Sequence, residues 1–193
     1  MKSSTCLALI LSALLAGGNL FAQQDKVSLV NPIIGTNGMG HTFPGACVPF
    51  GLVQLSPDTD TIPHNVDGKY QPRAYEYCAG YQHKDSSIVG FSHTHFSGTG
   101  HSDLGDILIM PTTGCLKLNP GTATNPDGGY RSRFSHDTEI SRPGYYEVML
   151  ADYGVKAQLT TTKRAGIHKY TFPKESKNQR IILDMIHGIY NYD

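Results

Sequence analysis

The last third of the chain alternates regularly between side chains suited to a core and side chains suited to solvent. Residues 145–150 read YYEVML and residues 155–159 read VKAQL, so the same character returns at every second position. A period of two residues is typical of a β-strand with one buried face. The segments 168–172 and 180–185 also have strand character, and short turns separate all four. The pattern therefore predicts an antiparallel meander.

The part of the chain before this region contains shorter apolar runs between turn-rich loops. Strands are predicted at 48–55, 88–95 and 106–110, and Pro111 is expected to end the last of them. The segment 56–82 is polar and irregular, and ordered loops of that length are often functional. Because short strands and turns dominate, we expect an all-β fold, an antiparallel β-sandwich.

The C-terminal end of the sequence bears on how complete this sandwich is. The chain ends at Asp193, directly after the last predicted strand and without a capping element. A sandwich that ends there leaves an edge strand unpaired. We therefore expect the sandwich to be incomplete at its C-terminal edge and the sequence to be the front part of a longer protein.

Composition and the N-terminus narrow the class of protein. Lys+Arg and Asp+Glu are equal at 16 each, which gives no basic surface for nucleic acid, and we expect no nucleic-acid partner. Residues 1–22 combine Lys2, a short apolar run and a small residue at Ala22, which is typical of a secretory signal peptide. We predict a periplasmic or secreted domain of residues 23–193, with no membrane contact after the signal is cleaved.

Three cysteines follow the signal peptide, at positions 47, 78 and 115. An exported chain can form one disulfide from three cysteines, and the sequence leaves their pairing open. No C-x-x-C motif occurs, which argues against a structural zinc ribbon.

The stretch GFSHTHFSGTGHSDLGDILIMP, residues 90–111, carries the densest candidate chemistry. On a strand, His93 and His95 would point to the same face and could bind a metal ion. A third ligand could come from His101, Asp103 or Asp106. An H-x-H pair without a spaced third ligand is common, so we favour hydrogen-bonded pocket or structural histidines and assign no metal ligand.

Two glycine-rich loops accompany these histidines. Gly98 and Gly100 permit either a tight turn or a close approach of the backbone to a ligand, and the sequence does not decide between the two. The loop 35–41 lacks the Gly-Lys-Ser/Thr ending of a phosphate loop. It fits better as a loop that presents His41 and backbone amides to a polar ligand.

The sequence assigns no nucleophile and no carboxylate pair. Serines lie near the histidines, but no G-x-S-x-G elbow is present. Glycoside hydrolysis by two carboxylates needs them on opposite sides of a cleft, and sequence alone does not pair the available acids. Aromatic side chains suited to stacking on sugar rings occur in the same loops: Phe43, Tyr70, Tyr75, Tyr77 and Tyr81.

Several segments, taken in order, resemble one known family. They are VNPIIGTNGMGHTFPGACVPFGLVQLSPDT at 30–59, CAGY at 78–81, IVGFSHTHFSGTGHSDLGDILIMPTTG at 88–114, RPGYYEVML at 142–150 and GVKAQLTTTKRAGIHKYTFP at 154–173. Their ordered combination resembles the N-terminal domain of glycoside hydrolase family 92, the exo-acting bacterial α-mannosidases. The resemblance covers essentially the whole chain after the signal peptide.

This resemblance implies a galactose-mutarotase-like supersandwich joined to an (α/α)6-barrel. It also implies hydrolysis of terminal α-linked mannose with inversion, dependent on Ca²⁺. The catalytic acid, the catalytic base and most Ca²⁺ contacts would come from the barrel, so no catalytic residue is assigned in this chain. The expected partners are a mannose-containing glycan and the barrel domain. The sandwich loops would help to line the sugar pocket, with the substrate-binding residues His41, Phe43, Tyr77, His93, His95, Gly98 and Gly100.

One departure and two alternatives remain. Many family members carry a tryptophan in the loop before the SGY-like motif, and this chain has none, so Tyr75 or Tyr77 would replace it and the linkage preference stays open. Without the barrel, the chain is expected to be inactive. It could instead be a stand-alone, non-catalytic carbohydrate-binding β-sandwich, or a small metallo-hydrolase that uses His93, His95 and His101.

Overall fold

The structure, a computed structural model, describes residues 26–101 and 103–189. Its strands are β1 (Ala46–Cys47), β2 (Gln54–Asp58), β3 (Asn65–Val66), β4 (Lys69–Tyr70), β5 (Ser87–Ile88), β6 (Gly90–Ser92), β7 (Leu108–Thr112), β8 (Ser132–Arg133), β9 (Ile140–Arg142), β10 (Tyr145–Leu150), β11 (Val155–Thr161), β12 (Gly166–Thr171) and β13 (Arg180–Asp184). The helical elements are short 3₁₀ turns: η1 (Lys26–Leu29), η2 (Pro72–Tyr77), η3 (Pro126–Gly128) and η4 (His136–Thr138). The all-β prediction is confirmed.

The meander predicted in the last third forms one sheet, in the order β12-β11-β10-β9. β10 pairs antiparallel with β11 from Tyr145↔Thr160 to Leu150↔Val155. Burial alternates along both strands, with the side chains of every second residue fully covered. The strands predicted at 145–150, 155–159 and 168–172 are therefore confirmed, with small differences at their ends.

A second sheet has the order β1-β2-β6-β7-β13. β13 leaves the meander and pairs antiparallel with β7, from Arg180↔Thr112 to Asp184↔Leu108. Pro111 was predicted to end this strand. It instead lies inside β7, opposite Ile181. The ladder between β6 and β7 is limited to the pair Phe91↔Ile109. This ladder does not reach Pro111, so Pro111 has no partner on the β6 side. A strand tolerates a residue without an N–H at such a position.

The prediction of a strand at 48–55 is wrong for the first half of that segment. Ala46 pairs with Leu55 and Cys47 with Gln54, so the residues between them form a hairpin turn. The N–H of Gly51 donates to the carbonyl of Val48 at 2.9 Å. The Pro49-Phe50-Gly51 sequence favours this turn and overrides the apolar run. The strand predicted at 88–95 is likewise divided into β5 and β6, and it ends at Ser92.

The two large sheets face each other across one apolar core, which makes the fold a β-sandwich. The five-stranded sheet and the meander both contribute to this core, with buried members Leu55, Phe91, Leu108, Met110, Tyr146, Val148, Leu150, Val155, Ala157 and Leu159. β13 is the last strand in its sheet, and its outward side chains Ile181 and Leu183 are 44% and 59% exposed. The expected incompleteness at this edge, and the supersandwich that the resemblance implies, stay predictions.

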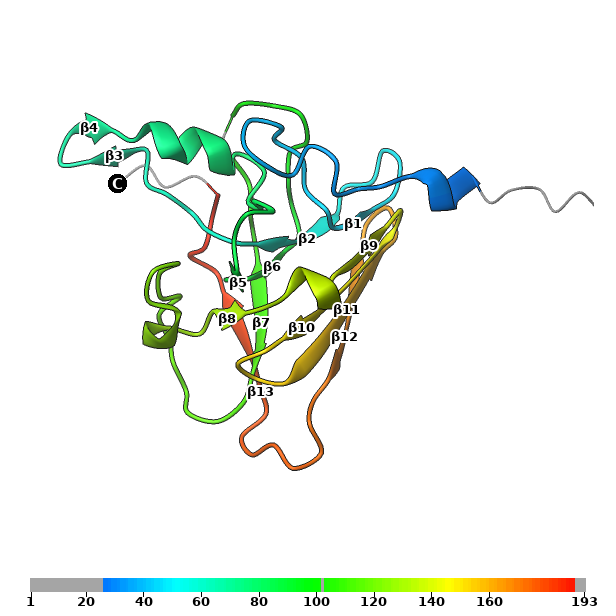
Figure 1. The fold of residues 1–193 in the computed structure, drawn as a ribbon, viewed down its shortest axis with the longest axis vertical. Coiled ribbons are helices and arrows are strands. Elements are labelled where there is room, and N and C mark those ends of the chain that lie inside the picture. Colours follow the sequence, from blue (N-terminus) through cyan, green and yellow to red (C-terminus); the bar gives the residue numbers. More distant parts are fainter. Residues whose placement is uncertain (1–25, 102, 190–193) are drawn as a thin grey trace, which may run out of the picture.

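Figure 1 shows the loops of residues 30–101 gathered at one end of the sandwich, beyond β1 and β2. The small hairpin β3–β4 and the helix η2 belong to this group. The predicted signal peptide, residues 1–22, lies outside the described residues. Within the residues that the structure describes, no helix has the length and apolar character that a membrane crossing requires.

Candidate functional site

Two loops that are far apart in sequence are bonded together at the loop-rich end. The N–H of Gly98 donates to the carbonyl of His41 at 2.6 Å. The His41 ring lies edge-on to Tyr75, with 4.7 Å between centroids. A Cβ added at Gly100 would lie 1.9 Å from the Tyr75 hydroxyl, so a larger residue there would displace the Tyr75 side chain. We call these four residues the loop junction.

A cavity of about 590 Å³ opens beside the loop junction. Its walls include Phe43, His95 and Ser97 from the two joined loops and Phe50 from the hairpin turn. Phe43 and His95 lie together, with 5.2 Å between ring centroids. An apolar wall with a few polar groups is typical of a pocket for a small polar ligand.

A buried carboxylate holds the histidine in this wall. Oδ1 of Asp58 accepts a hydrogen bond from Nε2 of His95 at 2.8 Å. Oδ2 accepts one from the Ser92 hydroxyl at 2.6 Å and one from Nε2 of His187 at 2.8 Å. The side chain of Asp58 has no exposed surface. We call these four residues the Asp58 cluster.

The Asp58 cluster is organised around charge. Burial alone would raise the pKa of Asp58, but the neighbouring His95 charge and the hydrogen bonds from His187 and His95 hold that pKa well below its usual range. Nδ1 of His95 also lies 2.7 Å from the carbonyl oxygen of Gln54. Nδ1 and Nε2 of His95 thus face a carbonyl and a carboxylate, two oxygens that only accept, so each ring nitrogen is placed to donate a hydrogen bond.

Ser92, His95 and Asp58 do not form a catalytic triad. In a triad the carboxylate and the serine bond to different ring nitrogens of the histidine. Here Nε2 of His95 lies 2.8 Å from Asp58 and 3.1 Å from the Ser92 hydroxyl, and the other nitrogen faces Gln54. No ring nitrogen is left to accept the serine proton, so the cluster anchors the loops and does not supply a nucleophile.

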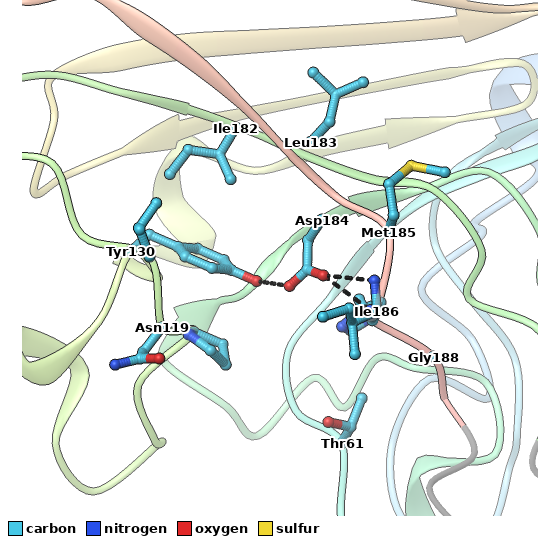
Figure 2. A pocket seen from close by; sticks show the side chains of 12 residues that line it. Thr61, Asn119, Tyr130, Ile182, Leu183, Asp184, Met185, Ile186 and Gly188 are labelled. Atoms are coloured by element: carbon cyan, nitrogen blue, oxygen red, sulfur yellow. Dashed lines mark hydrogen bonds between the residues drawn. The ribbon is translucent and has the colours of Figure 1, made fainter.

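A second cavity, of about 540 Å³, is lined in part by His187 and Asp184. Figure 2 shows the Tyr130 hydroxyl reaching Asp184, with the backbone after β13 folded back onto the same carboxylate. The hydroxyl donates to Oδ2 at 2.5 Å, and the N–H groups of Ile186 and His187 donate to Oδ1. His187 lines this cavity and His95 lines the first, so one buried carboxylate joins the walls of both.

His93 points away from His95 and belongs to a separate chain of hydrogen bonds. Its Nδ1 lies 2.8 Å from the carbonyl of Ile107, and its Nε2 lies 3.0 Å from Nε2 of His168. Nδ1 of His168 lies 2.6 Å from the Tyr170 hydroxyl. Burial, with the nearby His93, lowers the pKa of His168 to about 4. Two neutral rings satisfy every contact in this chain.

The structure separates the seven predicted substrate-binding residues into four groups. Phe43 and His95 line the cavity, whereas His41, Gly98 and Gly100 form the loop junction beside it. His93 packs against His168 on β12. Tyr77 is 2% exposed, and its hydroxyl donates to the carboxylate of Asp85. Contact with a sugar stays a prediction for all seven.

A different set of possible metal ligands was not predicted from the sequence. Among residues 26–101 and 103–189, the group that could hold a metal ion is His83, His136 and Glu139. The hypothetical set of His93, His95 and His101 is not grouped in this way. The H-x-x-E spacing of residues 136–139 was the available signal.

Cys47, Cys78 and Cys115 form no disulfide with one another.

Comparison with known proteins adds independent findings. Residues 29–193 match the glycosyl hydrolase family 92 N-terminal domain. The chain is similar to a family GH92 alpha-mannosidase of Bacteroides thetaiotaomicron, solved with mannoimidazole, at 48% identity and a TM-score of 0.77 over 85% of this chain and 20% of that one. A family GH92 inverting mannosidase of Bacteroides thetaiotaomicron VPI-5482 matches at 28% identity and a TM-score of 0.62, over 82% of this chain and 19% of that one.

An uncharacterized secreted glycosidase of Arthroderma benhamiae (strain ATCC MYA-4681 / CBS 112371) is 30% identical over 150 residues, which are 77% of this chain and 18% of that protein. The chain therefore spans about a fifth of the length of each of these relatives.

Proposed function

The chain belongs to glycosyl hydrolase family 92 and matches the N-terminal domain of that family. From that membership we propose that it is the N-terminal domain of a secreted α-mannosidase, which removes terminal α-linked mannose with inversion. The GH92 mannosidases among its relatives support the reaction, and the secreted glycosidase supports the location. A periplasmic or extracellular site agrees with the signal peptide expected at residues 1–22.

The contribution of this domain to the reaction would be to shape the sugar pocket. The observation that carries this proposal is the hydrogen bond between Gly98 and His41, which brings two family-like loops together beside the cavity. Phe43 offers an apolar ring face to a sugar, and Ser97 and Gln54 offer polar groups in the same wall. The acid and base carboxylates would come from another part of the enzyme.

Rigid support is the second part of this role. His95 lies behind Phe43, and its ring is fixed at both nitrogens by Gln54 and Asp58. A pocket wall that is fixed before substrate arrives loses little entropy on binding, which favours productive orientation. The Asp58 cluster would therefore act on catalysis through position and not through chemistry.

Calcium is expected for the family, and the described residues do not fit it. Ca²⁺ takes six to eight oxygen ligands, whereas the metal-type group here has two imidazoles and one carboxylate. We propose that any Ca²⁺ needed for activity is bound by the rest of the full-length enzyme. No step of the reaction is derived through that ion from this chain.

The test uses the full-length enzyme that carries this domain. Phe43→Ala should lower kcat/KM for an α-mannoside by about tenfold, because it removes about 1–2 kcal/mol of apolar contact from the pocket wall. Tyr70→Ala is the control, since Tyr70 is 57% exposed on β4 and lines neither cavity. Equal kinetics for wild type and Phe43→Ala would remove Phe43 from the pocket.

A non-catalytic carbohydrate-binding role has one observation in its favour. Phe50 is fully exposed at the rim of the cavity, as a sugar-stacking ring would be. Calorimetry of the chain by itself with mannose oligosaccharides separates this role from the first. Heat of binding that Phe50→Ala abolishes supports it, and no heat at millimolar sugar contradicts it.

A further inference from the structure

A cluster of histidine and glutamate side chains lies at the turn that leads into the meander sheet. His136 begins the 3₁₀ helix η4, and Glu139 follows it as the C-cap residue in an extended conformation. Nδ1 of His136 lies 2.6 Å from Oε2 of Glu139. The His136 side chain is 37% exposed and that of Glu139 is 3% exposed, so this pair has one open side.

Two buried tyrosines orient the Glu139 carboxylate. The Tyr81 hydroxyl donates to Oε1 at 2.9 Å, and the Tyr146 hydroxyl donates to the same oxygen at 2.6 Å. Both rings are at most 1% exposed. Hydrogen bonds of this kind fix the direction of a carboxylate that binds a metal ion.

His83 completes the group from a distant part of the chain. Its backbone N–H donates to the carbonyl of Thr36 at 2.8 Å, which places the residue in the loop after η2. Its ring lies over that of His136, with 3.9 Å between centroids and 34° between planes. One ligand atom from each of His83, His136 and Glu139 lies within 4.8 Å of the other two.

We propose that His83, His136 and Glu139 bind a divalent transition-metal ion, with Zn²⁺ as the best match. Two imidazoles and one carboxylate are a ligand set of Zn²⁺ sites that keep a fourth position for water. Ligand atoms at about 2.1 Å from a tetrahedral ion are about 3.4 Å apart. Nδ1 of His136 and Oε2 of Glu139, at 2.6 Å, are therefore about 0.8 Å too close, whereas the other ligand distances are at most about 1.4 Å too long. Rotation of the exposed His136 ring away from the carboxylate, with approach of the His83 ring, corrects both differences.

The bound ion joins the loop that carries His83 to the turn that carries His136. The Glu139 carboxylate accepts a hydrogen bond from Tyr146, which lies on β10 in the core. The metal-linked loop and turn are thereby connected to the sandwich. The open side at His136 leaves room for a water ligand. This inference does not depend on the mannosidase proposal, because none of the three ligands lines the cavity beside the loop junction.

Zn²⁺ titration of the untagged, chelator-treated 193-residue chain tests the proposal. Calorimetry should give one equivalent of bound Zn²⁺, and Co²⁺ in its place should give the strong visible absorption of a tetrahedral site. His136→Ala and His83→Ala should weaken binding at least about tenfold, and Tyr146→Phe should weaken it by about 10-fold through loss of orientation. At a given Zn²⁺ concentration, the Tm of wild type should rise more than that of His136→Ala.

Two controls make the result decisive. His93→Ala removes the competing pair of histidines at His93 and His168, and His101→Ala removes a histidine outside the group; both should bind Zn²⁺ as wild type does. His136 is exposed, so circular dichroism of His136→Ala should match wild type, which separates a loss of Zn²⁺ binding from a loss of folding. No Zn²⁺ binding to wild type, or unchanged binding in His136→Ala and His83→Ala, overturns the proposal.

Discussion

Oδ1 of Asp58 lies 2.8 Å from Nε2 of His95, and neither side chain has any exposed surface. A buried ion pair of this kind is destabilised severely when one partner is removed, because the other charge stays buried without compensation. The same carboxylate also accepts hydrogen bonds from Ser92 and His187. The geometry of both cavity walls therefore depends on the charge of one residue.

Replacing the Asp58 carboxylate by an amide tests this dependence. Asp58→Asn should lower the free energy of unfolding by about 3 kcal/mol, because an amide cannot compensate His95 and His187. Denaturant unfolding followed by circular dichroism measures the loss. Asp67→Asn is the matched control, since Asp67 is exposed with a φ of 52°, a conformation that asparagine tolerates. A loss below about 1 kcal/mol at Asp58 would contradict the ion-pair account.

A glycine behind the Asp58 cluster gives a second, steric test. A Cβ added at Gly80 would lie 2.0 Å from Oδ1 of Asp58, and Gly80 has a φ of 74°. Gly68 has the same φ and no atom within 4 Å of an added Cβ. Gly68→Ala therefore measures the backbone strain alone, about 1 kcal/mol. Gly80→Ala should cost about 2 kcal/mol more, through displacement of Asp58. Equal losses in the two variants would mean that the cluster adjusts without cost.

The hydrogen-bonded pair of His93 and His168 predicts a pH dependence of stability. His168 has a pKa near 4 in the folded protein and about 6.5 when unfolded. Between these values the unfolded chain binds more protons, so stability is fully present above pH 6.5 and falls as the pH drops towards 4. The loss should be on the order of 2 kcal/mol once partial exposure is discounted.

His168→Gln is the variant for this prediction, and His101→Gln is its control. Wild type and His101→Gln should lose stability in urea between pH 6.5 and pH 4. His168→Gln should show a smaller slope. Asp58 does not contribute to this window, because its pKa is held well below the usual range. The same slope in all three proteins would show that His168 is not the titrating group. Tyr170 and His93 are the groups that face His168.

The sequence predicted the meander well because its signal is local. Residues 145–150 and 155–159 alternate with period two, and each strand pairs with its neighbour in sequence. The partner of β13 was not predictable in this way, since its neighbour β7 precedes it by about seventy residues. The hairpin turn at Pro49-Phe50-Gly51 was present as a turn signal but was hidden by the apolar residues around it.

The site was predicted by residue type more than by arrangement. The loops with His41, Phe43 and His95 were identified, and the structure joins them. The expectation that His93 and His95 share a face assumed that the strand continues to residue 95. β6 ends at Ser92, so the two rings turn to different partners, His168 and Asp58. Asp58 and His187 are 129 residues apart, and no spacing rule joins them.

The edge strand β13 gives the last prediction, on self-association. Leu183 is 59% exposed on this strand, and exposed apolar edges favour pairing between chains. Leu183→Lys should leave the unfolding free energy within about 0.5 kcal/mol of wild type and should keep the chain monomeric at concentrations where wild type associates. Light scattering over a concentration series measures this. Ile182→Lys is the matched control, because Ile182 packs against the core and a buried lysine should destabilise the fold itself. If Leu183→Lys associates as strongly as wild type, the contact between copies does not use β13, and the apolar surface responsible lies elsewhere on the domain.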